Sequence, residues 1–228
     1  MSTLYVVATP IGNLEDISKR ALRILAEVDL ILCEDTRVTK RLLDHYQIKT
    51  PTLSYHQHSK IQKIEQVIGF LKGSKNLALV SDAGTPGISD PGGKLVKKVI
   101  ESLSNSVKIV PIPGPSAISA IASISGFSTD KFLFLGFPPV KKKRKKFFEE
   151  IINAKYPVVF YESPHRIIKT LKELELEAET YKSKIKIVVC RELTKKFETI
   201  CRGTTKEVIK QVEKDIIKGE FVIIVDRG

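Results

Sequence analysis

Short apolar runs alternate with amphipathic segments through the first half of the sequence, and this alternation constrains the fold most strongly. The runs have strand length and are apolar at successive positions; they span residues 4–9, 30–33, 77–81 and 107–111. Between them, apolar residues recur at helical spacing near residues 17–28, 36–46, 61–72 and 94–102. Strands that are apolar on both faces and separated by helices are typical of a parallel sheet covered on both sides.

The second half has a different texture. A helix is predicted at 116–125, after Pro113-Gly114-Pro115, and further helices at 165–174 and 205–218. Strands are predicted at 132–135, 157–161, 185–190, 197–202 and 221–225. The short gap between 190 and 197 suits a hairpin, so this half is expected to form a mixed sheet. A length of 228 residues fits one large domain or two. We expect two α/β domains, residues 1–115 and 116–228.

Charge and cysteine usage limit the function classes. The net charge is +12, from 38 Lys and Arg against 26 Asp and Glu. Such a field attracts polyanions, although a generally basic proteome would also produce it. The longest apolar runs are far shorter than the roughly 20 residues that span a bilayer, and we expect no secretory signal. Three scattered cysteines without a CxxC pair indicate reduced thiols and a cytoplasmic protein.

Three glycine- and proline-containing loops each follow a predicted strand. They span residues 9–13, 81–93 and 113–117, and the second contains four glycines and two prolines. In open parallel sheets, ligands bind beyond the carboxyl ends of the strands, so the three loops can form one pocket. Ordinary strand–helix turns are the alternative, but a loop as long as 81–93 favours function.

The pocket lacks both common phosphate-binding motifs. No GxGxxG follows the first strand, and no GxxxxGK[ST] occurs in the sequence. This pattern is compatible with a nucleoside ligand that carries no phosphate, such as S-adenosylmethionine. We expect no metal site, because His56 and His58 have no carboxylate at ligand spacing beside them.

Polar residues leave two predicted strands. Glu34, Asp35 and Arg37 follow the strand 30–33, where Asp35 or Thr36 alternatively caps the next helix. In the second half, Glu162, His165 and Arg166 follow the strand 157–161. There Ser163-Pro164 suggests a helix N-cap followed by a proline in the first turn.

Residues 141–146 form a run of six cations, KKKRKK. A solvated helix start is one interpretation. Six cations in a first helical turn would, however, oppose the helix macrodipole. We therefore favour a role in binding phosphates.

Five segments, taken together, resemble a known family. They are 4–17 (LYVVATPIGNLEDI), 33–37 (CEDTR), 81–92 (SDAGTPGISDPG), 113–117 (PGPSA) and 161–166 (YESPHR). They are similar to the ribosomal RNA small-subunit methyltransferase I family of the tetrapyrrole methylase superfamily. The resemblance implies a two-domain class III methyltransferase that forms a homodimer, with S-adenosylmethionine in the cleft between its domains. It also implies 2′-O-methylation of a cytidine in 16S ribosomal RNA, as naked RNA or in the assembled small subunit.

The resemblance also assigns roles to residues. The cofactor-binding positions that it implies are Ile11, Asp82, Gly84, Thr85, Ser116, Ala117 and Tyr161. From loop position, the candidate bases are Glu34, Asp35 and Glu162. The candidate RNA-binding residues are Arg37, Lys142, Lys143, Lys145, Lys146, His165 and Arg166. The alternatives are a methyltransferase acting on a tetrapyrrole or another small molecule, and an RNA-binding module without catalysis.

Two departures from the pattern matter. Residues 9–12 (TPIG) replace the glycine-rich first loop usual in the superfamily, so tetrapyrrole substrate rules are not expected to apply. Many members of the family extend beyond the final strand, and RNA contacts made by that extension are expected to be absent here.

Overall fold

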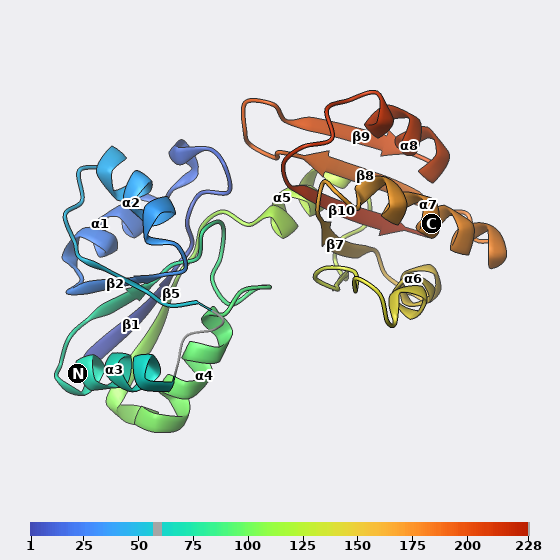
Figure 1. Ribbon diagram of the computed structural model, residues 1–228. Helices are drawn as coiled ribbons and strands as arrows, with labels where there is room; N and C mark the ends of the chain where they lie inside the picture. The colour runs from blue at the N-terminus through green and yellow to red at the C-terminus, as the bar shows by residue number, and fades with distance from the viewer. Residues whose placement is uncertain (57–60, 228) are drawn as a thin grey trace. The chain divides into compact units, whose positions relative to one another are not determined.

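The structure is a computed structural model that describes residues 1–56 and 61–227. The chain divides into two compact units, Met1–Ser116 and Ala117–Gly228 (Figure 1). Each unit has its own five-stranded sheet and its own hydrophobic core.

The sheet of the first unit is entirely parallel, as predicted. Its strands are β1 (Ser2–Val7), β2 (Leu30–Cys33), β3 (Thr52–Ser54), β4 (Leu77–Leu79) and β5 (Val107–Ile112). The strand order is β3-β2-β4-β1-β5, so β1 lies between β4 and β5. The loops that follow these three strands therefore leave the sheet at neighbouring positions.

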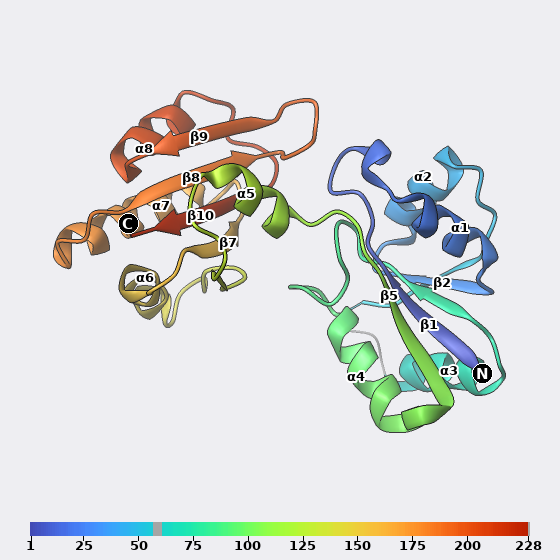
Figure 2. The ribbon, with the colours of Figure 1, turned by 180° about the vertical axis from the view of Figure 1, so that it is seen from behind.

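Helices cover both faces of this sheet (Figure 2). They are α1 (Lys19–Glu27), α2 (Thr36–His45), α3 (Ile61–Lys72) and α4 (Gly92–Leu103), with the short 3-10 helices Leu14–Asp16 and Ser104–Ser106. Along β2, Ile31 and Cys33 pack with α1 and α2, whereas Leu32 packs with α3 and α4. Successive strand residues point to opposite faces, so both faces are apolar because both are buried.

The sheet of the second unit is mixed, with the order β6-β7-β10-β8-β9. Its strands are β6 (Leu133–Phe134), β7 (Val158–Glu162), β8 (Lys186–Arg191), β9 (Thr199–Gly203) and β10 (Phe221–Asp226). Only β6 and β7 pair in parallel. The predicted hairpin is confirmed, because β8 and β9 are antiparallel with Val189 opposite Cys201.

Three helices of the second unit share one core against this sheet, and one helix lies on the other face (Figure 2). They are α6 (Arg144–Asn153), α7 (Ile167–Thr180) and α8 (Thr205–Glu213) on one face, and α5 (Ala117–Ser125) on the other. Phe148 of α6, Leu171 of α7 and Val208 of α8 pack with Phe160 and Ile223 of the sheet.

Several local predictions were wrong. The strand β3 was not predicted, because Thr52-Leu53-Ser54 has one apolar residue and is only half-buried. Ser163 does not cap α7: its carbonyl accepts hydrogen bonds from the N–H groups of Arg166 and Ile167, in a turn before the helix begins. The last predicted helix ends at Glu213, five residues early.

All three cysteines are unpaired and buried. Within residues 1–56 and 61–227, no helix has the length and apolarity to cross a membrane. The same residues contain no group of three or more His, Cys, Asp or Glu side chains suited to a metal ion. His58 lies outside the described residues.

Candidate functional site

Three loops of the first unit meet beyond the carboxyl ends of β4, β1 and β5. Thr9 and Gly84 exchange backbone hydrogen bonds of 2.9 and 3.1 Å, which join the first loop to the long loop. The hydroxyl of Thr85 donates to the carbonyl of Pro115 at 3.2 Å, which joins the long loop to the third. The parallel sheet thus brings together the segments that were expected to share one edge.

Close packing at this edge depends on small residues. Gly84 has a φ of +80°, and a Cβ placed there would lie 3.3 Å from Cγ2 of Ile11. A Cβ at Gly114 would lie 3.1 Å from Cβ of Ala8. Below them, the buried Thr9 hydroxyl donates to the carbonyl of Ser81 at 3.2 Å. The loops are therefore fixed to one another, which lowers the entropy cost of binding a ligand.

The predicted cofactor-binding residues fall into two groups. Ile11, Asp82, Gly84 and Thr85 belong to the joined loops, and Ser116 directly follows Pro115. Ala117 begins α5 and Tyr161 lies in β7, both in the second unit. The structure thus places the first group at one sheet edge and the rest in the other unit.

Three carboxyl groups interact at the carboxyl ends of β2 and β4. Burial, reinforced by the negative charges of Asp82 and Asp90, raises the pKa of Glu34 to about 7. Asp82 accepts a hydrogen bond from the backbone N–H of Asp35 at 3.0 Å. Asp90 accepts from the N–H groups of Gly87 and Gly92 at 2.8 and 2.7 Å. The resulting field opposes a phosphate and favours a cationic ligand.

Asp35 has a different environment. It caps α2 by accepting a hydrogen bond from the N–H of Arg37 at 2.8 Å, so the capping interpretation is confirmed. The guanidinium of Arg37 also binds this carboxylate, with one contact at 2.6 Å. These hydrogen bonds to Arg37 lower the pKa of Asp35 to about 2. Asp35 is therefore a weak base, and Arg37 is partly neutralised.

Glu162 is buried in the second unit, and its side chain is 0% exposed. One carboxylate oxygen lies 2.8 Å from the guanidinium of Arg166. The other accepts from the hydroxyl of Thr170 at 2.5 Å and lies 3.9 Å from Arg144. A base must reach a hydroxyl that enters from solvent. This geometry disfavours Glu162 as a base and indicates a structural role.

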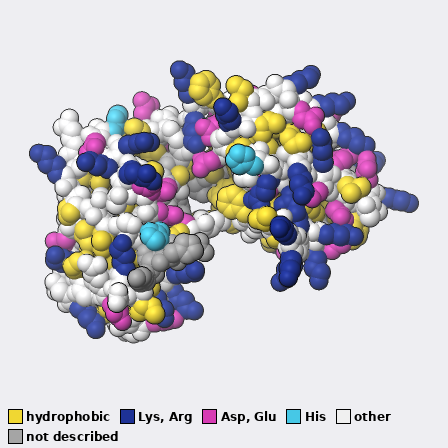
Figure 3. All heavy atoms as spheres, in the orientation of Figure 1, with side chains coloured by type: hydrophobic (Ala, Val, Ile, Leu, Met, Phe, Trp, Pro, Cys, Tyr) yellow, Lys and Arg dark blue, Asp and Glu magenta, His cyan; other side chains and the backbone are white. Residues whose placement is uncertain are grey.

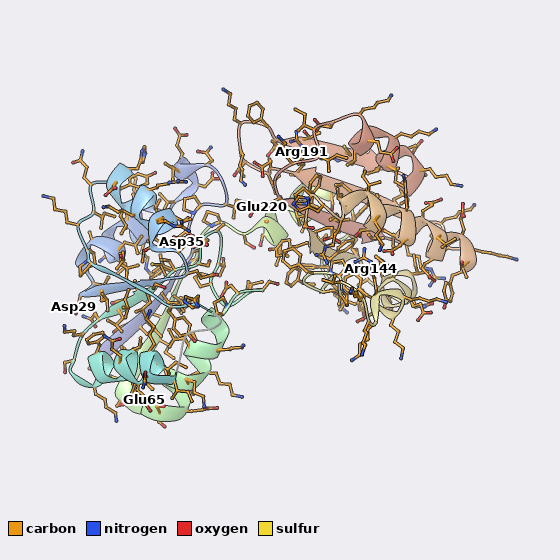
Figure 4. The ribbon with its side chains drawn as sticks, in the orientation of Figure 1. Asp29, Asp35, Glu65, Arg144, Arg191 and Glu220 are labelled. Atoms are coloured by element: carbon orange, nitrogen blue, oxygen red, sulfur yellow. The ribbon has the colours of Figure 1, made fainter. Side chains whose placement is uncertain are left out.

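Arg144 divides the basic run. Its guanidinium is buried, with Nε 2.5 Å from Glu173 and Nη2 2.6 Å from the hydroxyl of Thr170 (Figure 4). The helix α6 begins at Arg144, so the alternative of a helix that starts with all six cations does not hold: only the last three lie in its first turn. Lys143 precedes the helix with a φ of +65°. The chain turns there, and the lysines before it lie in a loop.

The other candidate RNA-binding residues of the second unit are mostly exposed. Figure 3 shows Lys and Arg side chains crowded over the α6 segment. The exposed candidates are Lys142, Lys143, Lys145, Lys146 and His165. Arg166 is the exception, because its guanidinium is held by Glu162, Ser163 and Pro138.

Sequence reasoning missed the roles of Asp90 and Arg144. Asp90 lies inside the glycine loop 81–93, where a carboxylate that binds loop N–H groups was a recognisable signal. Arg144 is the one arginine among five lysines of the run. Arginine is the cation best suited to a buried pairing with carboxylates, so its identity was the available signal.

Comparison with known proteins decides the family. Residues 3–209 match the family described as Tetrapyrrole (Corrin/Porphyrin) Methylases. Ribosomal RNA small subunit methyltransferase I of Halalkalibacterium halodurans is 44% identical over 225 residues, which cover 98% of this chain and 75% of that protein. The protein of the same name from Thermotoga maritima is 41% identical, with 98% of both chains covered. The chain belongs to the ribosomal RNA small subunit methyltransferase I family.

Fold comparison agrees with membership of this family. The cobalt precorrin-4 methyltransferase of cobalamin biosynthesis superimposes with a TM-score of 0.68 at 18% identity, covering 97% of this chain and 94% of the other. At that identity the likeness establishes the fold alone. The two-domain class III methyltransferase fold expected from the sequence is thus confirmed.

Methyltransferases of this family use S-adenosylmethionine as methyl donor. The residues at the sheet edge of the first unit fit that molecule. It carries a sulfonium, an ammonium and a carboxylate group, so it is a net cation without a phosphate. The negative field of Glu34, Asp82 and Asp90 favours a ligand with net positive charge. Gly84, with its φ of +80°, also lets the long loop pack closely against Ile11 of the first loop.

Proposed function

We propose that this chain transfers the methyl group of S-adenosylmethionine to the 2′-oxygen of a cytidine ribose in small-subunit ribosomal RNA. The observation that carries this proposal is the 41–45% identity, over nearly the whole chain, to proteins named ribosomal RNA small subunit methyltransferase I. The basic charge of the second unit supports an RNA substrate. That unit has 23 Lys and Arg against 15 Asp and Glu, whereas the first unit has 15 against 11.

The cofactor when bound supplies an activated methyl group, so the protein mainly has to hold and align the reactants. We assign cofactor binding to Ile11, Asp82, Gly84, Thr85, Ser116, Ala117 and Tyr161. The first four belong to loops that already contact one another through Thr9, Gly84 and Pro115. Such preorganisation supports rapid, specific binding of a small ligand.

We assign the base to Glu34. A ribose hydroxyl is a weak nucleophile, and a base whose pKa lies near the working pH removes its proton most effectively. Glu34 has a pKa of about 7 and is half-buried, so it remains accessible from solvent. Asp35, with a pKa of about 2, is too weak. Glu162 is enclosed by its own partners.

The proposal is tested by product analysis. Purified protein is incubated with methyl-labelled S-adenosylmethionine and either naked 16S RNA or assembled small subunits. We expect label in RNA and one phosphodiester that resists alkaline hydrolysis, because a methylated 2′-oxygen cannot attack the neighbouring phosphate. Label that stays on the base after nucleoside digestion would exclude ribose methylation.

A second candidate function is methylation of a tetrapyrrole. The match of residues 3–209 to the family described as Tetrapyrrole (Corrin/Porphyrin) Methylases favours it, and a basic surface also suits a substrate with many carboxylates. The same assay with a precorrin as acceptor separates the two candidates, and we expect no incorporation. A protein that binds RNA and the cofactor but labels neither acceptor would instead be a non-catalytic RNA-binding module.

The exposed lysines around the start of α6 are expected to bind RNA phosphates. The test variant changes four of them to Gln: Lys142, Lys143, Lys145 and Lys146. Each lost phosphate contact lowers the slope of log K against log salt by about 0.7 for single-stranded RNA. We expect a flatter slope and weaker RNA binding, with cofactor affinity unchanged.

The control for this variant makes the same charge change on exposed lysines of the first unit. These are Lys49, Lys72, Lys97 and Lys108. For the control variant, the slope of log K for RNA binding against log salt is expected to stay close to that of the wild type. If the two variants flatten the slope equally, the run at α6 has no special role, and general charge accounts for RNA attraction.

A homodimer in the cytoplasm completes the proposal. The family resemblance supports both the homodimer and the cytoplasmic location. The buried, unpaired cysteines also suit a reducing compartment. Sedimentation equilibrium at micromolar concentration gives the mass directly. A monomer across that range would contradict the dimer while leaving the methyl-transfer proposal intact.

A further inference from the structure

The loop between β6 and α6 exposes an aromatic ring beside a group of lysines. Phe137 is 51% exposed and Val140 is 68% exposed, so two large apolar side chains reach solvent from one short loop. Three exposed lysines, at positions 141, 142 and 143, follow directly. From residue 131 to residue 148 the sequence contains no Asp or Glu.

Two guanidinium groups, which belong to Arg144 and Arg166, hold this loop by hydrogen bonds to its backbone carbonyls. Arg144 donates to the carbonyl of Pro139 at 3.0 Å, and Arg166 donates to the carbonyl of Pro138 at 3.2 Å. The buried carboxylate of Glu162 lies between them, 2.8 Å from Arg166 and 3.9 Å from Arg144. Two adjacent carbonyls are thus fixed, in a stretch where proline already restricts φ. The backbone next to the exposed ring of Phe137 is therefore held in place by hydrogen bonds.

The ring of Phe137 is also supported from one side. Its centroid lies 5.3 Å from that of Tyr161, with an interplanar angle of 51°. Tyr161 in turn meets Phe134 edge-on at 5.1 Å. These contacts fix the ring while half of its surface stays open to solvent. An aromatic surface fixed in this way loses little entropy when a planar group stacks on it.

We propose that Phe137 stacks on an unpaired base of the substrate RNA while the lysines at 141–143 contact neighbouring phosphates. Three residues act as positioning residues in this arrangement. Arg166 holds the ring through the carbonyl of Pro138, and Arg144 holds the lysine loop through the carbonyl of Pro139. Glu162 contacts both guanidinium groups. An aromatic platform beside a positive surface is how proteins commonly bind single-stranded nucleic acid. This inference rests on the proposed function, because it assumes an RNA substrate.

Charge favours RNA over a second copy of this chain as the occupant. Two copies meeting through this surface would bring together segments that both carry exposed lysines and no acidic residue. Like charges across an interface are destabilising, whereas RNA neutralises them and releases counterions. The exposed ring then contacts a base, and the lysines contact the backbone on either side.

The experiment compares Phe137→Ala with Phe137→Tyr and with Leu176→Ala. Leu176 is a matched control, since it is also apolar and 60% exposed but lies on α7. The probe is a short single-stranded RNA with a fluorescent cytidine analogue whose emission falls on stacking. Base stacking on an aromatic ring contributes about 1–3 kcal/mol, so Phe137→Ala is expected to raise the RNA Kd about 5- to 150-fold. The salt slope and the affinity for S-adenosylmethionine stay unchanged.

A conservative variant tests the role of the ring, and a double-mutant cycle tests the positioning role of Arg166. Phe137→Tyr keeps the ring and is expected to retain tight binding and quenching, as is Leu176→Ala. Arg166→Gln removes the hydrogen bond to the carbonyl of Pro138. As a single change in the otherwise wild-type protein, it is expected to weaken RNA binding. Combined with Phe137→Ala it adds little, because both changes remove one interaction. Additive effects, or a flatter salt slope for Arg166→Gln, would contradict its positioning role.

Three outcomes would overturn the stacking proposal. They are unchanged RNA affinity in Phe137→Ala, a loss of S-adenosylmethionine affinity in that variant, and a change in its oligomeric state. The last two would assign the ring to the cofactor site or to a protein interface. If the wild type methylates RNA and Phe137→Ala is unaffected, the stacking inference alone fails. If the wild type neither binds nor methylates RNA, the proposed function fails first.

Discussion

Glu34→Gln is expected to lower kcat/KM for RNA methylation by about 10²- to 10⁴-fold, the usual range for loss of a general base. The amide cannot accept the proton of the ribose hydroxyl, but it has nearly the same shape as the carboxyl group. Binding of RNA and of S-adenosylmethionine should therefore change much less than turnover. Single-turnover rates with saturating RNA separate the chemical step from binding.

The pH profile makes this prediction specific. A base acts when deprotonated, so the wild-type kcat/KM should rise with pH and level off above about 7, the pKa of Glu34. Asp90→Asn removes one of the charges that raise this pKa and should move the rise to lower pH. A Glu34→Gln enzyme that keeps an unchanged rise near pH 7 would show that another group is the base. Asp35, with a pKa of about 2, does not titrate there.

The same carboxyl group is expected to affect stability with a definite sign. Its pKa is higher in the folded protein than the ordinary 4.5, so the folded state binds the proton more tightly than the unfolded state. The free energy of unfolding therefore falls as pH rises from about 4.5 to 7. Glu34→Gln should unfold at a higher temperature than wild type at pH 8 and at a similar temperature at pH 4.

The sequence predicted the sheet and its loops because those features are local. In the first unit, apolar runs of four to six residues separated by helical periodicity have few alternatives to a covered parallel sheet. The position of the glycine loops then follows from strand direction alone, since parallel strands end at one edge. The contacts that join Thr9 to Gly84 and Thr85 to Pro115 realise that expectation.

Side-chain burial at strand ends was not predictable in this way. Glu34 and Glu162 both leave an apolar strand and are followed by polar residues, so the sequence does not distinguish them. Their difference comes from tertiary partners. Arg144, distant in the chain, reaches Glu162, whereas Glu34 lies near two further carboxylates. The carboxyl group of Glu162 is thereby paired with two guanidinium groups, whereas burial and two neighbouring carboxylates raise the pKa of Glu34 to about 7.

Glu162→Ala is expected to destabilise the second unit by about 3–5 kcal/mol, the range for removing one partner of a buried ion pair. Two guanidinium groups, of Arg144 and Arg166, would lose their shared carboxylate, and the hydroxyl of Thr170 would lose its acceptor. Hydrogen exchange followed by mass spectrometry should show faster exchange in β7 and α7 and little change in the first unit. Glu173→Ala is the control, because that carboxylate is 31% exposed and its loss should cost clearly less.

Glu162→Gln separates this structural role from catalysis. The amide keeps the shape and accepts the hydrogen bond from Thr170, so enough folded protein should remain for kinetics. If Glu162 only positions the loop 136–143, the variant should raise the RNA concentration needed for half-maximal turnover and keep the pH profile of the wild type. A loss of kcat at saturating RNA, together with loss of the rise near pH 7, would assign the proton transfer to Glu162. In that case Glu34 would be an acidic residue of the cofactor site and not the base.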